Sequence, residues 1–407
     1  MSAPIRALHV LGGLDRGGAE TWLVQILERM DRSRVAIDVF SQSEREGAYE
    51  ERVLATGARV FRSPPPSRPL AYLAKLRGVI GGRSGSAPNQ APGQAPTRYD
   101  VVHCHLHHWS GAVLSVARSA GVPVRVAHSR SALFTDAARA GTAMAAYYAA
   151  MKPLVRWSMT HGLAVSGLAG ESLFGSSWPA DPRLALAPSG IDLDEFAIDV
   201  DSDMDRVALR CELDLSDDAL VVGHVGRFER LKNHPFLADI AIELARLDER
   251  AVMVFVGDGS GRADTERKLA EAGVLDRVRF AGLRTDVARL LVGVFDVCVL
   301  PSLWEGLPRV ANESQAAGKP IVVSNHLAAE VEVVAPLVRR LPLSAGAAAW
   351  ARALLDCAGD AMPARDATAR MRGSGIDIDR GAADLVSLYE RALGVAEPGA
   401  AGEWGPA

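Results

Sequence analysis

A predicted helix lies between two short apolar runs, and no other stretch of the sequence constrains the fold as strongly. Val297–Leu300 and Pro320–Val323 have the length and apolar character of buried strands. A turn, Pro301–Gly306, follows the first strand, and the helix is predicted to begin near Pro308 because the fixed φ of proline suits a first helical turn. Buried strands joined through a helix are typical of a parallel α/β sheet.

Two carboxylates flank the start of this helix and suggest a ligand. Glu305 lies just before the N-terminus of the helix, and Glu313 lies within the helix. Eight helical residues rise about 12 Å, which is too far for one metal ion but suits an extended ligand with hydroxyls at both ends, such as a nucleoside diphosphate sugar. Glu313 could hold a ribose diol and Glu305 the sugar hydroxyls. Alternatively, both are carboxylates favoured at a helix N-terminus by the macrodipole.

The whole chain has the length and composition of a two-domain globular protein. It has 407 residues and a formal net charge of −4, a balance that does not indicate a nucleic-acid partner. Its cysteines form no CxxC pair, which favours a reducing compartment. The N-terminal residues lack a signal-peptide pattern, and no run of 18 apolar residues occurs. These features predict a cytoplasmic protein.

The N-terminal segment resembles a phosphate site. Ile5–Val10 predicts a buried strand, followed by a glycine-rich loop and a helix that contains Trp22 and Leu23. Gly17 and Gly18 would let backbone N–H groups and the positive helix end face a diphosphate. The alternative is a plain tight turn between strand and helix.

The α/β alternation continues through the chain and sets the predicted domains. Residues 1–191 form an N-terminal domain with a disordered insertion at about 81–97, which is rich in Gly, Pro, Ser and Gln. Residues 192–378 form a second domain. Its first residues are an acidic linker whose Asp-x-Asp pairs are interpreted as a solvated loop. A C-terminal helix, 379–394, and a flexible tail, 395–407, follow.

Histidines mark the ends of two predicted strands. The segment Asp100–Trp109 contains four histidines and Cys104, but a strand sends His103 and His105 to one face and Cys104 to the other. We therefore predict no metal site there, and expect a strand end that lines an acceptor cleft. His128 follows the predicted strand Val124–Ala127 and could bind a sugar or an acceptor hydroxyl; a structural histidine is the alternative.

Basic residues follow the first strand of the second domain, Val221–Val225. Arg227 and Lys232 are the cations expected to converge on a diphosphate and neutralise the charge that grows on it as the glycosidic bond breaks. Arg230 is interpreted as a surface charge. For any single basic residue, a surface charge is the alternative.

Three motifs together resemble the GT-B glycosyltransferases of family 4. They are Gly17-Gly18-Ala19-Glu20, the Gly-Arg-x4-Lys-Asn pattern of residues 226–233, and the signature from Glu305 through Glu313 to Pro320. The resemblance spans residues 5–395. It implies an α/β fold of two facing Rossmann-like, doubly wound domains with an interdomain cleft, and a C-terminal helix that crosses back to the first domain. Two positions differ from the family pattern, namely Arg130, where a second histidine is usual, and Ser189, where an asparagine is usual.

The resemblance also implies a reaction. A sugar passes from a UDP- or GDP-sugar to a hydroxyl group, with retention of configuration and without a metal or other cofactor. Arg227 and Lys232 then stabilise the leaving diphosphate, Glu305 positions the sugar, and His128 contacts the sugar or the acceptor. The implied donor-binding residues are Gly17, Gly18, Glu313, Gly306, Leu307 and Arg284. Main-chain groups near Leu283 and Arg284 are expected to read the nucleobase.

The acceptor is predicted less directly. Arg125–Ser129 is similar to the same region of capsule and exopolysaccharide glycosyltransferases, which implies a glycan or lipid-linked acceptor at the inner face of the membrane. The helical region Thr135–Thr160, with aromatic and basic residues, could rest on that membrane or pack on the first domain. Two alternative functions are glycosyl transfer to soluble small molecules and non-catalytic binding of a sugar nucleotide. A sugar-nucleotide epimerase is disfavoured by the signature from Glu305 to Pro320.

Overall fold

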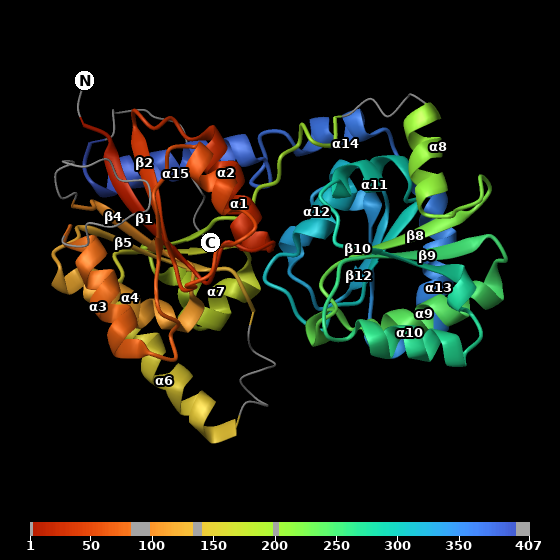
Figure 1. Cartoon of the computed structure of the whole chain (residues 1–407), viewed down its shortest axis with the longest axis horizontal. Helices are drawn as coiled ribbons and strands as arrows, with labels where there is room; N and C mark the ends of the chain where they lie inside the picture. Colours follow the sequence, from red (N-terminus) through yellow and green to blue (C-terminus); the bar gives the residue numbers. More distant parts are fainter. Residues whose placement is uncertain (1–2, 83–97, 133–140, 198–202, 396–407) are drawn as a thin grey trace. The chain divides into compact units, whose positions relative to one another are not determined.

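The chain forms two compact units. The computed structural model describes residues 3–82, 98–132, 141–197 and 203–395. Unit 1 comprises Met1–Gly190 together with Asp377–Ala407, and unit 2 comprises Ile191–Ile376 (Figure 1). The predicted insertion, apart from residues 81–82, and the predicted tail, apart from residue 395, lie outside the described residues.

Unit 1 contains a parallel sheet of seven strands in the order β3-β2-β1-β4-β5-β6-β7. Apolar residues that are buried on both faces of the sheet explain why these segments form central parallel strands. The pairing of β1 with β4 sets His9 opposite His103. The strands are β1 (Ile5–Leu11), β2 (Val35–Ser41), β3 (Val60–Arg62), β4 (Val101–Cys104), β5 (Val124–Ser129), β6 (His161–Ala164) and β7 (Leu184–Leu186).

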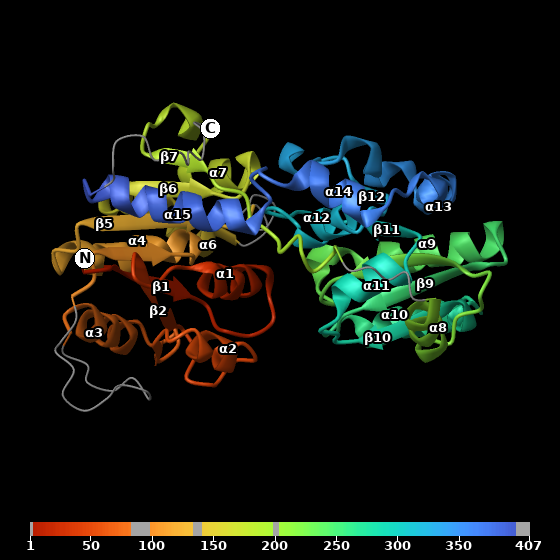
Figure 2. The ribbon, with the colours of Figure 1, turned by 90° about the horizontal axis from the view of Figure 1, so that it is seen from above.

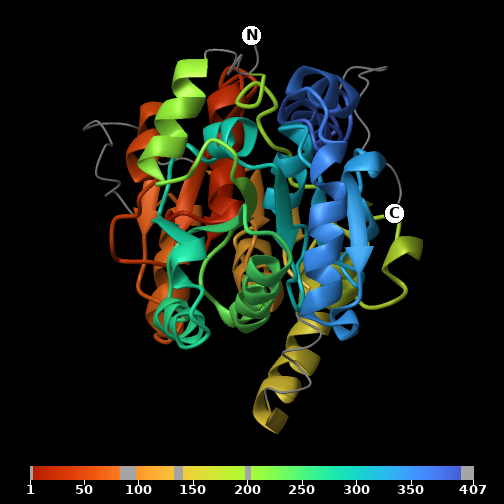
Figure 3. The same ribbon diagram turned by 90° about the vertical axis from the view of Figure 1, so that its right-hand side faces the viewer.

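Helices cover both faces of this sheet. On one face, α1 (Gly18–Arg29), α2 (Glu50–Ala55) and α15 (Ile378–Ala392) share a core that includes Trp22, Leu385 and Tyr389. Figure 2 shows α15 lying across the strands beside α1. The other face packs against α3 (Pro69–Ile80), α4 (Ser110–Ser119), α6 (Gly141–Ser158) and α7 (Gly167–Phe174). The first half of α6 projects away from the sheet (Figures 1 and 3).

Unit 2 contains a parallel sheet of six strands in the order β10-β9-β8-β11-β12-β13. The strands are β8 (Leu220–Val225), β9 (Ala251–Val256), β10 (Val278–Gly282), β11 (Val297–Leu300), β12 (Ile321–Ser324) and β13 (Val338–Leu341). The helices are α8 (Asp203–Glu212), α9 (His234–Leu247), α10 (Arg262–Glu271), α11 (Val287–Gly293), α12 (Arg309–Ala316), α13 (Ala347–Cys357) and α14 (Ala364–Met371). One core joins α9, α10 and α13 to the sheet and includes the fully buried Phe255 and Trp350.

Each sheet has one point where the strand order reverses. In unit 1 this point lies between β1 and β4, and in unit 2 it lies between β8 and β11. Ligands of doubly wound sheets bind beyond the carboxyl ends of the strands at this point. The loops after these four strands are therefore where a site is expected. None of the helices in the described part of the chain combines the length and apolar character that crossing a bilayer requires.

Candidate active site

Two loops of unit 2 are tied together at its reversal point. The loop after β8 ends in a short 3-10 turn, Arg230–Lys232, and then in Asn233, whose φ of 60° is left-handed. The Asn233 side chain donates a hydrogen bond to the carbonyl of Pro301, at 3.2 Å, in the loop after β11. The backbone N–H of Leu303 donates to the carbonyl of Leu231 at 2.8 Å. These bonds hold the two loops against each other.

Lys232 and Glu305 form an ion pair between these loops. Nζ of Lys232 lies 2.7 Å from Oε1 of Glu305, and each side chain is only 14% exposed. Ser302 Oγ donates a second hydrogen bond to the same carboxylate oxygen at 2.9 Å. The sequence predicted both residues for the site, and the structure brings them into direct contact. The pair supplies a cation and an acceptor-only anion at the ends of neighbouring strands.

Glycines allow the Lys232 side chain to lie against the loop. A Cβ on Gly226 would lie 3.0 Å from Lys232 Cε and 3.1 Å from Nε2 of His224. Gly257, with φ of 135°, packs against the carbonyl of Gly226, where any side chain would overlap it. His224 Nδ1 donates to the carbonyl of Val299 at 3.0 Å, and burial lowers its pKa well below the usual value. His224 was not foreseen from the sequence.

Arg227 lies apart from the Lys232–Glu305 pair in its described contacts. Its guanidinium is 2.9 Å from Oε1 of Glu229, and 63% of its side chain is exposed. Glu313 lies on α12, where its Oε1 is 3.4 Å from Nε of Arg309 one turn earlier. Gly306 and Leu307 are buried in the non-helical loop before α12.

Arg284 is compensated by two carboxylates. Its guanidinium donates to Asp286 at 2.8 Å and 2.7 Å and also contacts Glu212. These two partners, Asp286 first, raise the pKa of Arg284 above its usual value. A guanidinium with two acidic partners has little net charge to offer a phosphate, which suits a main-chain role for this loop better than an ionic one.

The predicted phosphate loop of unit 1 lies at the N-terminus of α1. Gly17 is the N-cap residue and Gly18 the first helical residue. The carboxylate of Glu20, which follows within the first turn, lies over Gly17 so closely that a Cβ there would overlap it. A carboxylate is favoured at this position by the helix dipole. A phosphate group would therefore have to displace Glu20 before it could contact the helix end.

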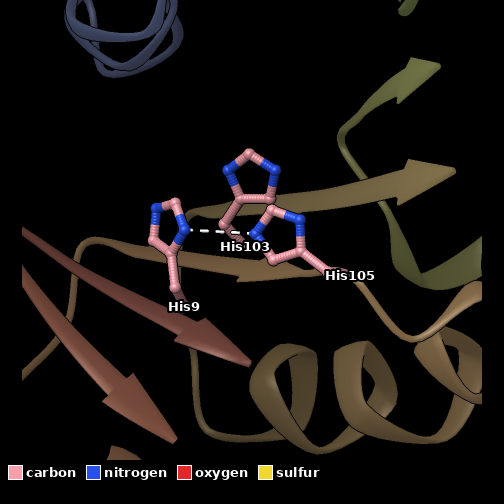
Figure 4. A group of neighbouring side chains, drawn as sticks. All are labelled: His9, His103 and His105. Atoms are coloured by element: carbon pink, nitrogen blue, oxygen red, sulfur yellow. Dashed lines mark hydrogen bonds between the residues drawn. The ribbon is translucent and has the colours of Figure 1, made fainter. Parts of the chain in front are cut away.

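Four histidines at three neighbouring strands form a cluster in unit 1, in which three residues are buried and His105 is half-buried. They are His9 on β1, His103 on β4, His105 just beyond β4, and His128 on β5. Ring nitrogens of His103 and His128 lie 3.0 Å apart, and those of His105 and His9 lie 3.1 Å apart. Figure 4 shows how the rings of His9, His103 and His105 gather, with the hydrogen bond between His9 and His105. The hydroxyl of Tyr389 on α15 bonds both His9 and His103.

The cluster is electrically neutral at physiological pH. Burial, and then the charge of Arg130, lower the pKa of His9 to about 3. The same two causes contribute to lowering the pKa of His103, His105 and His128 well below the usual value. Ligand atoms of His9, His103 and His105 lie within 4.8 Å of one another, which is a set that could hold a metal ion. The positive charge of Arg130 and the existing hydrogen bonds of these rings oppose a cation there.

The two departures from the family pattern contact each other. Arg130 Nη2 donates to Ser189 Oγ at 2.8 Å, and the guanidinium stacks over Trp22 with 4.3 Å to the ring centre. The Trp22 ring meets the His128 ring edge-on at 5.6 Å. Arg130 and Ser189 therefore form one local contact at the edge of the cluster.

Sequence reasoning missed His9 and Tyr389. A signal for His9 was present, because a polar residue two positions before the end of a buried first strand faces the strand that pairs with it. No comparable signal existed for Tyr389, since an amphipathic helix pattern gives a buried face but not the residues that this face meets.

The sequence was compared with known protein families and structures. Residues 17–187 match the family described as glycosyl transferase 4-like domain, and residues 219–360 match glycosyl transferases group 1. The chain is 32% identical over 391 residues to EpsF of Bacillus subtilis, which is named as a glycosyltransferase, covering 95% of this chain and 97% of that protein. The chain belongs to the group 1, GT4-like glycosyltransferases.

Other relatives of this glycosyltransferase agree. A D-inositol 3-phosphate glycosyltransferase of Streptomyces scabiei is 30% identical over 430 residues, covering 97% of this chain and 90% of that protein. The structure of HepE of Anabaena, in complex with UDP and glucose, superposes with a TM-score of 0.70 at 19% identity and covers 96% of this chain and 97% of that one. This likeness shows the GT-B fold of two Rossmann-like domains.

Proposed function

We propose that this glycosyltransferase moves a sugar from a UDP- or GDP-sugar to a hydroxyl group with retention of anomeric configuration. The observation that carries the proposal is the Lys232–Glu305 pair, at 2.7 Å, where the strand order of unit 2 reverses. HepE, which shares the fold, was crystallised with UDP-glucose. That complex supports a nucleotide-sugar donor.

Lys232 and Glu305 exchange partners when the donor binds. In the proposed reaction the ammonium group of Lys232 turns from the carboxylate to the diphosphate and stabilises the charge that develops as the bond to the sugar breaks. The carboxylate of Glu305 accepts hydrogen bonds from sugar hydroxyls, which replace the proton donors it loses. The exposed guanidinium of Arg227 adds a second cation to the diphosphate, and Glu313 holds the ribose diol.

The acceptor hydroxyl attacks from the face that the diphosphate leaves. The bond between the sugar carbon and the diphosphate oxygen breaks, the bond to the acceptor oxygen forms, and the hydroxyl proton passes to the departing phosphate. This path uses no protein nucleophile and no metal ion. His128 is proposed to contact the sugar or the acceptor.

We infer a glycan or lipid-linked acceptor in cell-surface polysaccharide synthesis as the first candidate. The similarity to EpsF along nearly the whole chain supports it. On α6, Trp157 is 55% exposed with Arg118 stacked on it at 4.2 Å, a pairing suited to peripheral contact with an anionic membrane. A soluble small-molecule acceptor is the second candidate, favoured by the D-inositol 3-phosphate relative.

Donor binding tests the proposal directly. The thermal stability of the purified protein is measured against UDP-, GDP-, ADP- and dTDP-sugars, for the native chain and for Glu313→Ala. Ligand at 100 times its dissociation constant adds about 2.7 kcal/mol of stability. We expect a shift with one nucleobase that Glu313→Ala loses. The absence of a shift with every sugar nucleotide would contradict the proposal.

The control variant is Glu266→Ala. Glu266 pairs with Arg262 one turn earlier on α10, as Glu313 pairs with Arg309 on α12. It should keep the full donor-dependent shift. Recovery of the protein from membranes only with detergent would favour the lipid-linked acceptor over a soluble one.

A further inference from the structure

Five side chains of unit 1 form one unbranched line of hydrogen bonds. His105 Nε2 lies 3.1 Å from His9 Nδ1, and His9 Nε2 lies 2.9 Å from the Tyr389 hydroxyl. The same hydroxyl lies 2.6 Å from His103 Nδ1, and His103 Nε2 lies 3.0 Å from His128 Nδ1. The line thus runs from His105 through His9, Tyr389 and His103 to His128.

Proton counting restricts this line to two arrangements. Burial keeps the four rings neutral and Tyr389 protonated, so each group carries one N–H or O–H proton. Each of the four contacts needs one proton, and the Tyr389 hydroxyl can donate to only one of its two histidines. If it donates to His103, all four rings carry their proton on Nε2. If it donates to His9, all four carry it on Nδ1.

The two ends of the line therefore have opposite character. His105 Nδ1 and His128 Nε2 are buried and make no hydrogen bond of standard geometry to another described residue. The backbone carbonyl of Ala187 nevertheless faces the His128 ring as an acceptor and acts to raise its pKa, against the larger effect of burial. Because His103 already engages Nδ1 of His128, this carbonyl favours the first arrangement, with the His128 proton on Nε2. In the first arrangement His128 Nε2 is a donor and His105 Nδ1 an acceptor. In the second arrangement these roles are exchanged.

We propose that Tyr389 is a positioning residue that couples the hydrogen-bonding character of His128 to that of His105. Because the Ala187 carbonyl favours a proton on His128 Nε2, the line sets His105 Nδ1 as an acceptor. The line therefore presents an acceptor at His105 to a ligand hydroxyl that donates, as a sugar can supply. The use of the coupling for sugar recognition rests on the proposed transfer reaction, whereas the coupling itself does not.

The contribution of the hydroxyl can be separated from packing. Tyr389 packs within the core between the sheet, α1 and α15, and it is fully buried. Tyr389→Phe keeps the ring in this core and removes only the oxygen. A buried N–H without a partner is rarer and costlier than a bare ring nitrogen. His9 and His103 should then both move their protons away from residue 389.

The experiment is long-range 1H–15N correlation NMR on the full chain with 15N-labelled histidine at neutral pH. We expect all four rings of the native protein in the same tautomer. In Tyr389→Phe we expect a split, with His9 and His105 carrying the proton on Nδ1, and His103 and His128 on Nε2. His105→Asn and His128→Asn assign the signals of the two end rings.

The control is Tyr72→Phe, which removes another fully buried phenol hydroxyl of unit 1 outside the line. This variant should leave all four histidine rings in the same tautomer. Mixed tautomers in the native protein, a uniform pattern in Tyr389→Phe, or a split in Tyr72→Phe would each overturn the proposal. The native pattern tests the proton count without any variant, so a variant that failed to fold would not remove the test.

A transfer assay separates the coupling from the proposed function. Loss of one neutral hydrogen-bond link should lower kcat/KM of Tyr389→Phe about fivefold, while Tyr72→Phe retains the native value. The tautomer pattern with no sugar transfer by any variant would support the coupling and contradict the proposed function. If Tyr389→Phe showed the split of tautomers but kept full transfer activity, the coupling would not contribute to sugar recognition.

Discussion

Lys232 and Glu305 compensate each other in the ligand-free protein. Both side chains are mostly buried, and an unpaired charge in such a position is costly. The donor offers each of them a replacement, because the diphosphate is an anion and the sugar hydroxyls are donors. Opening the pair therefore leaves neither charge without a partner once the donor is bound.

Removal of the Lys232 ammonium should lower turnover, beyond any loss of stability from leaving Glu305 without its cation. Lys232→Ala deletes one preorganised group that stabilises the leaving diphosphate, and the loss of such a group costs on the order of 100-fold or more in kcat. Steady-state kinetics with the donor identified by the stability screen measure this effect.

Lys268→Ala is the matched control for this prediction. Lys268 forms an ion pair with Asp239 at 2.6 Å in the same unit, on the surface between α9 and α10. Its removal should leave kcat near the native value. If Lys232→Ala kept near-native turnover, the assigned role of Lys232 would be wrong.

At this scale the sequence predicted which residues gather better than how they point. The spacing after β8 predicted both Arg227 and Lys232 as cations of the site. Their side-chain directions depend on the 3-10 turn and on the left-handed Asn233, which no residue pattern specified. Lys232 consequently meets Glu305 while Arg227 meets Glu229.

The ends of β1, β4 and β5 place four histidines where burial opposes their protonation. The folded pKa of His9 is lowered from 6.5 to about 3, and those of its three neighbours are lowered in the same direction. Below pH 6.5 the unfolded chain binds protons that the folded chain does not, so the free energy of unfolding falls as pH falls.

Unit 1 should therefore lose stability between pH 6.5 and about 3. Each of these histidines contributes a slope of up to about 1.4 kcal/mol per pH unit in this window, and the contribution is fully retained above it. Denaturant unfolding at several pH values, followed by a probe in unit 1, measures the slope. His105→Asn should reduce this slope by the contribution of one histidine, up to about 1.4 kcal/mol per pH unit. An unchanged slope in this variant would contradict the explanation.

The elements themselves were largely legible from the sequence. The predicted strands Val297–Leu300 and Val221–Val225 match β11 and, within a residue, β8, because short apolar runs between turns have few other solutions. The chemistry at the element ends was less legible. Gly17 and Gly18 at the start of α1 suggested a helix N-terminus open to a phosphate, but the Glu20 carboxylate lies over Gly17, where the helix dipole favours a negative charge.

At the scale of the molecule, the two units differ in how they are assembled from the chain. Unit 2 is one continuous segment, Ile191–Ile376, whereas unit 1 needs Asp377–Ala407 in addition to Met1–Gly190. Helix α15 contributes Ile378, Leu385 and Tyr389 to the core of unit 1. An uninterrupted segment with its own core can fold by itself.

We expect residues 191–376 to unfold cooperatively as an isolated fragment, and residues 1–190 to lack a cooperative transition. A synthetic peptide of residues 377–395 should give residues 1–190 a cooperative unfolding transition, because it covers the apolar face of that fragment. Denaturant unfolding monitored by circular dichroism measures all three samples. Cooperative unfolding of residues 1–190 without the peptide would show that α15 is dispensable.

The position of α15 also bears on how the polypeptide matures on the ribosome. Domains generally fold in the order in which they are synthesised, but here the core of unit 1 requires α15, which follows unit 2 in the sequence. Unit 2 can close while unit 1 is still missing a layer. A nascent chain that terminated before Tyr389 would carry every predicted donor-binding residue and still lack the hydroxyl that joins His9 and His103. Translation beyond Tyr389 would therefore be a condition for that part of the site.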